Sequence, residues 1–66
     1  MFNLDNTYLN KQHQRYTNAP SPQIANDALW RAASAVGLLH RHETSEDEFT
    51  PDRVAEIVRQ LGWSQR

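Results

Sequence analysis

The side chains with the most obvious chemical potential in this 66-residue chain are its histidines and a run of acids. His40 and His42 lie two positions apart, and Glu43 follows directly. Residues two apart on a helix point about 200° from each other. These imidazoles could therefore share a metal ion only in extended backbone, with Glu43 or Glu46 added. Zinc sites generally show firmer spacing, such as two histidines at i and i+4. We expect no metal and no cofactor, and place both histidines at a solvated helix end, where a cation suits the helix dipole.

Catalysis is not expected either. Acid–base chemistry needs titratable groups in a concave, partly dry pocket, and a chain of this length is too small to enclose one alone. His13 is isolated and is expected at the surface. Two glycines in the whole sequence leave no Gly-rich phosphate loop, so we expect a protein that is not an enzyme. Five of the eight acids lie between residues 43 and 52: Glu43, Glu46, Asp47, Glu48 and Asp52.

The charge pattern gives an alternative function. A net charge of −1 creates no overall field that would attract nucleic acid or an anionic membrane. The N-terminal third, however, carries Lys11 and Arg15 against the single acid Asp5. With Tyr8 and Tyr16 alongside, this basic arm could contact phosphates or bases. The alternative is therefore a small nucleic-acid-binding regulator that uses Lys11 and Arg15.

Composition also limits the compartment and the means of stabilisation. A domain of this size buries only about 60% of the surface that its unfolded chain exposes. The sequence has no cysteine, which excludes disulfides and thiolate metal sites and gives no sign of an oxidising compartment. The N-terminus lacks the pattern of a signal peptide, and no apolar stretch approaches the roughly 20 residues of a membrane span. We expect a cytoplasmic protein without membrane contact.

Two prolines mark where the first long helix begins. The stretch "NAPSP" at 18–22 is a break, in which Ser21 acts as N-cap and Pro22 occupies the first helical position. Apolar residues then recur at spacings of three and four, which predicts a helix over about 22–40. A helix that ends at Gly37 is the alternative. Residues 1–20 are polar, and we expect a short helix over about 7–16 or an arm that orders against another surface.

The second helix is expected over about 51–61. Thr50 is its N-cap, and Gly62 is the natural left-handed residue after its last turn. Trp63 should then fold back on Val58 and Arg59 in a Schellman arrangement.

The connection before this helix carries its own signal. Ser45 and Glu48 have the spacing of a capping box, so a single helical turn could form between them. Phe49 can act as a hydrophobic staple against Val54, one turn inside the second helix.

These elements predict an all-α fold with one domain. We expect an N-terminal short helix or ordered arm over 1–20, and an antiparallel helical hairpin within 21–66. In this hairpin, one face of each helix packs against the other. The expected contacts set Leu29, Ala32, Val36 and Leu39 against Val54, Ile57, Val58 and Leu61.

The first helix has more apolar surface than one neighbour can cover, since Trp30 and Leu38 extend its stripe sideways. The N-terminal segment, a second copy of the chain or a different protein could supply the missing layer. The function we predict is a small non-enzymatic protein-binding module, such as an adaptor, a regulatory subunit or an inhibitor, with a homodimer as one form. The candidate partner-binding residues are Trp30, Leu38, Tyr8, Tyr16 and Trp63.

Overall fold

The computed structural model describes residues 6–63 of the chain. Its elements are α1 (Asn6–Thr17), α2 (Pro22–Val36), a single 3-10 turn η1 (Glu46–Glu48) and α3 (Pro51–Leu61). The described residues hold helices and no strand, which confirms the predicted all-α class.

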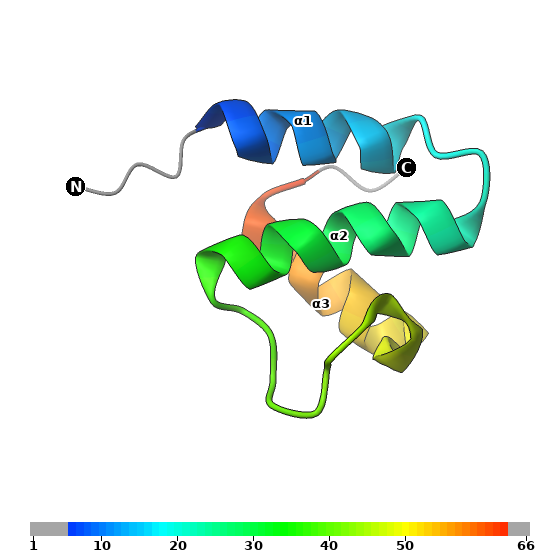
Figure 1. Ribbon diagram of the computed structural model, residues 1–66, viewed down its shortest axis with the longest axis vertical. Coiled ribbons are helices and arrows are strands. Elements are labelled where there is room, and N and C mark those ends of the chain that lie inside the picture. Colours follow the sequence, from blue (N-terminus) through cyan, green and yellow to red (C-terminus); the bar gives the residue numbers. More distant parts are fainter. Residues whose placement is uncertain (1–5, 64–66) are drawn as a thin grey trace.

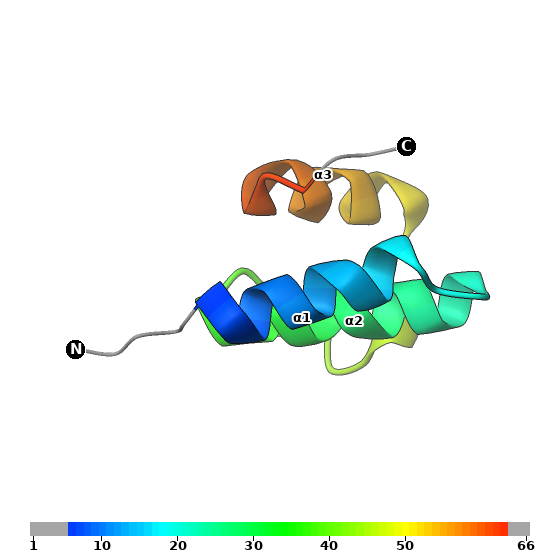
Figure 2. The same ribbon diagram turned by 90° about the horizontal axis from the view of Figure 1, so that it is seen from above.

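The N-terminal segment supplies the missing layer. α1 lies beside α2 and runs antiparallel to it (Figures 1 and 2), because the connection 18–21 is too short for any other arrangement. At the end of this connection the Ser21 hydroxyl accepts a hydrogen bond from the Ile24 amide at 3.3 Å, which confirms the predicted cap. The short helix predicted over 7–16 is likewise confirmed, one residue longer at each end.

α2 ends earlier than predicted. Gly37 adopts the left-handed conformation with φ 78°, and the Leu38 amide donates to the Ala33 carbonyl at 2.9 Å. This geometry closes a Schellman motif, which stops the helix at Val36. The predicted continuation to His40 is wrong, and the alternative stop at Gly37 is correct. Leu38 lies in the loop after α2, and its side chain is still partly buried against the core.

The predicted helical turn after Ser45 and the predicted cap at Thr50 are confirmed. In η1 the Ser45 hydroxyl accepts from the Asp47 amide at 3.2 Å, and not from the Glu48 amide as in a capping box. In α3 the Thr50 hydroxyl accepts from the Arg53 amide at 3.2 Å. Each cap satisfies a backbone N–H that has no partner within its own first turn.

The relative direction of the helices differs from the prediction. α2 and α3 pack against each other, but both run in the same general sense in two perpendicular views (Figures 1 and 2). The antiparallel pair is α1 with α2. The reason is the length of the connection over residues 37–50, which carries the chain back alongside α2 before α3 begins (Figure 1).

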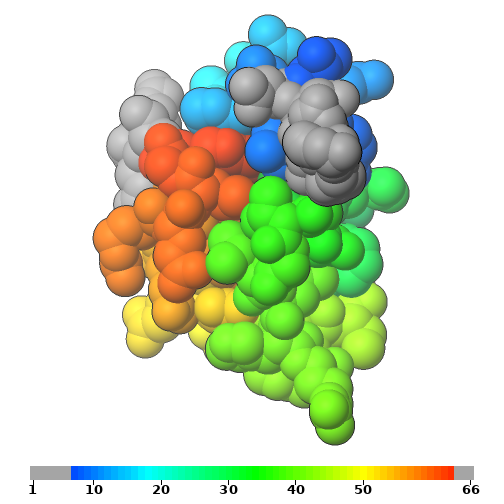
Figure 3. Space-filling model, turned by 90° about the vertical axis from the view of Figure 1, so that its left-hand side faces the viewer, coloured from blue at the N-terminus to red at the C-terminus, as the bar shows by residue number. Residues whose placement is uncertain are grey.

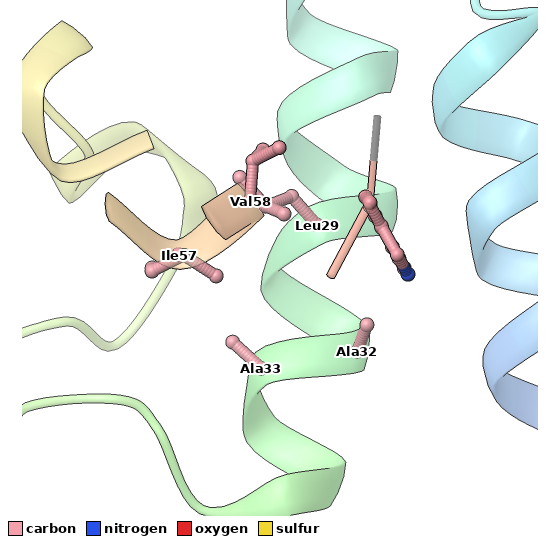
Figure 4. Close-up of a cluster of buried hydrophobic side chains, with 6 residues drawn as sticks. Leu29, Ala32, Ala33, Ile57 and Val58 are labelled. Carbon is pink, nitrogen blue, oxygen red and sulfur yellow. The ribbon is translucent and has the colours of Figure 1, made fainter. Parts of the chain in front are cut away.

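The core lies where α2 meets α3. Leu29 and Ala33 face Ile57 and Val58, and these four side chains are fully buried (Figure 4). Small alanines on α2 let the neighbouring backbones approach closely, because little side chain intervenes. The predicted contact of Leu29 with Ile57 and Val58 is confirmed, but Ala33 and not Ala32 lies on the side of α3, and Ala32 points toward α1 (Figure 4). The predicted role of Val36 is wrong, because this side chain is 39% exposed. The early stop of α2 accounts for that exposure, since Val36 is the last helical residue and lies at the open end of the interface.

The predicted Schellman end of α3 is confirmed. Gly62 has φ 78°, and its amide donates to the Arg59 carbonyl at 3.1 Å. The Trp63 amide donates to the Val58 carbonyl at 3.0 Å. These two bonds reverse the chain and turn Trp63 back over the helix.

The indole of Trp63 nevertheless finds its aromatic partners on another helix. Its ring stacks on the imidazole of His13, with 4.8 Å between centroids and 4° between planes. The Tyr16 ring lies 5.3 Å away, tilted by 45°. The expected location of His13 as an isolated surface residue is wrong, and so is a purely local environment for Trp63. The indole is 9% exposed and links α1 to the end of α3.

Candidate functional site

An open groove lies where the end of α1, the first turns of α2 and the start of α3 meet. Its volume is about 470 Å³. Phe49 and Val54 contribute from one side and Tyr16 from the other, and all three also pack against the core. The side chains that line this groove, called here the Tyr16–Phe49 groove, are Tyr16, Asn26, Phe49, Thr50, Pro51, Val54 and Ala55.

The local sequence explains why the groove is firm. Thr50 caps α3 and Pro51 fixes its first turn, so the backbone under Phe49 and Val54 is held in place. On the opposite wall, Tyr16 is braced by the ring of Trp63. Phe49 and Val54 line the groove together, as the predicted staple requires. The groove is therefore a preformed surface, in which the apolar side chains of Phe49 and Val54 lie beside polar ones such as Asn26.

Four acids adjoin the groove residues Phe49 and Pro51 in the sequence. Three acids precede Phe49 directly and a fourth follows Pro51. Within residues 6–63, none of these four carboxylates forms an ion pair. All four are at least partly open to solvent. We call this set, which consists of Glu46, Asp47, Glu48 and Asp52, the acidic rim.

The charged side chains near the α1 side of the groove instead form ion pairs with one another. Asp27 accepts hydrogen bonds from Arg15 at 3.1 Å and from Arg31 at 3.0 Å. Burial alone would raise the pKa of Asp27, but the hydrogen bonds from Arg31 and Arg15 outweigh it and lower that pKa. Arg15 also donates to the buried Gln12 at 2.8 Å. This network fastens α1 to α2.

A second constellation lies in the loop after α2. The Glu43 side chain is 2% exposed, although it belongs to the acid run that sequence patterning places in a solvated loop. Arg53 donates two hydrogen bonds to its carboxylate, at 2.7 Å from Nε and 3.0 Å from Nη2. The His40 amide donates a third at 2.7 Å. The hydrogen bonds from Arg53 outweigh the effect of burial and lower the pKa of Glu43 to about 2.

The residues around this ion pair attach the loop to α3 and to α2. Arg53, from the first turn of α3, also donates to the Leu38 carbonyl at 2.6 Å. The Trp30 indole, from α2, donates to the Glu43 carbonyl at 3.0 Å. Sequence patterning missed this arrangement, because a Glu–Arg pair ten residues apart with no shared helix face gives no periodic signal.

The two neighbouring histidines lie beside this carboxylate. His40 Nδ1 and His42 Nε2 are each 3.9 Å from Glu43 Oε2. Their side chains are 58% and 68% exposed. Since α2 stops at Val36, they are not at a helix end as predicted. The backbone here is a hydrogen-bonded turn, closed by the Glu43 amide on the His40 carbonyl, and not the extended backbone that sequence patterning required for a shared ligand. The turn brings both imidazoles to the same carboxylate oxygen.

The predicted partner-binding residues are dispersed. Tyr16 lines the groove, whereas Trp63 is taken up by the core. Trp30 and Leu38 are partly buried, the first donating to the loop and the second packing on the core. Tyr8 is 37% exposed on α1. The apolar surplus of α2 is thus largely covered by the chain's own first helix and loop.

The two basic residues predicted for nucleic-acid binding, Lys11 and Arg15, have different environments. Lys11 is exposed on α1. Arg15 is engaged by Asp27 and Gln12 and is only partly available.

Comparison with protein-family models, with curated proteins and with solved structures finds no significant match to this chain. Among residues 6–63, no helix has both the length and the apolar character that crossing a bilayer requires.

Proposed function

We propose that the protein is a small non-enzymatic binding module whose Tyr16–Phe49 groove takes an apolar side chain of a partner protein. The partner segment carries lysine or arginine next to that apolar anchor. This proposal rests on a preformed groove with aromatic and aliphatic side chains in its lining, whose residues Phe49 and Pro51 adjoin the acidic rim in the sequence. The carboxylates of the rim form no ion pair among the described residues.

The size of the groove suits a side chain better than a whole helix. Its volume, about 470 Å³, falls within the roughly 300–1,000 Å³ of typical ligand pockets. Burying one large apolar side chain contributes roughly 1.5–3 kcal/mol. Each exposed ion pair with the rim adds at most about 1 kcal/mol. We therefore expect a weak to moderate interaction, with charge acting mainly on association rate and specificity.

This chemistry suits an adaptor, a regulatory subunit or an inhibitor, each of which acts by occupying a partner's exposed segment. Tyr16 is the one predicted partner-binding residue that the proposal keeps in that role. On composition alone, the cytoplasm stays the proposed compartment. The nucleic-acid alternative has less support, because Arg15 is engaged by Asp27.

The test is selection of binding peptides from a random library, with the untagged full chain as bait, followed by affinity measurement. Ala55→Lys introduces a long cation into the groove. Ala35→Lys makes the same chemical change at an exposed alanine of α2 that does not line the groove. We expect the selected peptides to share an apolar residue flanked by lysine or arginine. Their affinity should fall at least about tenfold in Ala55→Lys and stay unchanged in Ala35→Lys.

Two results would count against the proposal. One is a set of selected peptides without basic residues. The other is equal affinity for both lysine variants, which would move the binding surface elsewhere. Concentration-dependent dimerisation that Ala55→Lys abolishes would replace the basic partner with a second copy of this chain.

A further inference from the structure

We propose that His40, His42 and Glu43 form a binding site for a divalent transition metal ion, specifically Zn²⁺. One ligand atom from each residue lies within 4.8 Å of the other two. Two imidazole nitrogens and one carboxylate oxygen form a donor set that zinc binds in proteins, with water in the fourth position. The site is separate from the Tyr16–Phe49 groove and shares no residue with it.

The distances are close to those that coordination requires. His40 Nδ1 and His42 Nε2 each lie 3.9 Å from Glu43 Oε2. Around a tetrahedral zinc ion with bonds near 2.0 Å, ligand atoms stand about 3.3 Å apart. Each nitrogen–oxygen pair must therefore close by less than about 1 Å. Both imidazoles are largely exposed, and rotation about their side-chain bonds supplies that movement without a change in the packed core.

The backbone between the ligands is already fixed. The Glu43 amide donates to the His40 carbonyl at 2.9 Å, and the Thr44 amide donates to the His42 carbonyl at 3.1 Å. The Trp30 indole anchors the Glu43 carbonyl. The loop that carries these residues projects from one end of the molecule (Figure 3), so a hydrated ion reaches it directly. Little ordering remains to be done when the ion binds.

Arg53 orients the carboxylate and also limits affinity. Glu43 Oε1 accepts from the His40 amide and from Arg53 Nη2, whereas Oε2 accepts only from Arg53 Nε among the described residues. A carboxylate oxygen has two lone pairs, so Oε2 keeps one for a metal ion. Hydrogen-bonded partners of this kind hold metal-binding carboxylates in place. The guanidinium charge opposes a dication, so we expect a dissociation constant of micromolar order.

The test is calorimetric titration of the untagged full chain with ZnCl₂ alone. The variants are His40→Gln and His42→Gln, both at exposed positions, so the fold is retained. Arg41→Gln is the matched control, because Arg41 lies between the two histidines and is exposed. We expect one Zn²⁺ per chain. The affinity should fall at least about tenfold in each histidine variant and be kept in Arg41→Gln. Absence of binding by the parent chain at 100 µM ZnCl₂, or equal affinity in all variants, would overturn the proposal.

A second measurement identifies the ligand atoms. Nitrogen NMR of the histidine rings should show Zn²⁺ acting on Nδ1 of His40 and on Nε2 of His42, with the other ring nitrogen of each remaining protonated. The ring of His13 should be unaffected, because it is stacked on Trp63 away from this loop. Zn²⁺ shifts confined to His13, or to one histidine of the loop, would refute the three-residue site.

Discussion

Replacing Glu43 with glutamine should destabilise the chain by about 2–3 kcal/mol. The hydrogen bonds from Arg53 lower the pKa of Glu43 from 4.5 to about 2, which corresponds to roughly 3 kcal/mol of preference for the ionised form in the folded state. Glutamine keeps the shape and can still accept hydrogen bonds, so part of this preference survives. Arg53 is left without its counter-charge, although its side chain is only 10% exposed.

The assay is thermal unfolding followed by circular dichroism at pH 7. A chain of this length has a total stability of roughly 3–10 kcal/mol. The expected loss lowers the melting temperature by about 8–20 °C. The matched control is Glu56→Gln, which removes the other carboxylate bonded to Arg53. Because Glu56 is 45% exposed, its ion pair contributes little and the melting temperature should change by no more than a few degrees. Equal effects of the two substitutions would refute the structural role assigned to Glu43.

The same pair of proteins gives a pH dependence of known sign. The folded pKa of Glu43 is depressed, so its contribution is fully present above pH 4.5 and is lost as pH falls toward 2. The stability difference between the parent chain and Glu43→Gln should therefore shrink over this window. Asp27, whose pKa is also lowered, is present in both proteins and cancels in the difference. A difference that stays constant down to pH 2 would contradict the ion-pair explanation.

Three further substitutions test the packing. Trp63→Ala should lower the free energy of unfolding, measured by thermal unfolding, by about 3–5 kcal/mol, since it empties the space between α1 and α3. The control Tyr8→Ala, at an exposed position, should change it by no more than about 0.5 kcal/mol, and a similar loss in both variants would contradict this packing. Gly62→Ala should shift the urea midpoint by an amount equivalent to about 1 kcal/mol, because φ is 78° there although a Cβ meets no neighbour; an unchanged midpoint would argue against a left-handed cap. Ala32→Leu should overpack a fully buried site and cost about 1–3 kcal/mol in the same urea assay, and a stabilised variant would indicate unfilled space.

Local signals in the sequence predicted the helices well. The caps at Ser21 and Thr50 are side chains that satisfy free amides within one turn, so they can be recognised from a few consecutive residues. Gly62 ends α3 for an equally local reason. The apolar residues after Gly37 favoured a longer helix. In the structure α2 ends there, because Gly37 has a positive φ and the capping hydrogen bonds of a Schellman motif close the last turn. Leu38 shows why periodicity misled, since a loop residue can also be buried.

The long-range contacts could not be predicted from periodicity. The stack of His13 on Trp63 joins two helices fifty residues apart, and neither residue belongs to an apolar stripe. The direction of α3 depends on the path of the connection 37–50, whose local signals at Ser45 and Phe49 do not specify how the segment crosses the molecule. The Glu43–Arg53 pair depends on that same path.

The two candidate sites also depend on contacts between residues far apart in the sequence. Sequence patterning named Tyr16 for partner binding, but the groove forms only because residues from α1, α2 and α3 meet. Sequence patterning allowed His40 and His42 a shared ligand only in extended backbone, and a metal site was set aside because the spacing is not that of a typical zinc site. The structure brings them together by a turn instead, since α2 ends at Val36 and the Glu43 amide bonds the His40 carbonyl.

We propose above that the Tyr16–Phe49 groove is the surface that binds a basic, apolar partner segment. Its most direct test is backbone NMR of the full chain titrated with a peptide selected as described above. We expect the largest shifts on Tyr16, Asn26, Val54 and Ala55, and an affinity that weakens as salt rises. Shifts centred instead on Tyr8, or an affinity that is independent of salt, would contradict it.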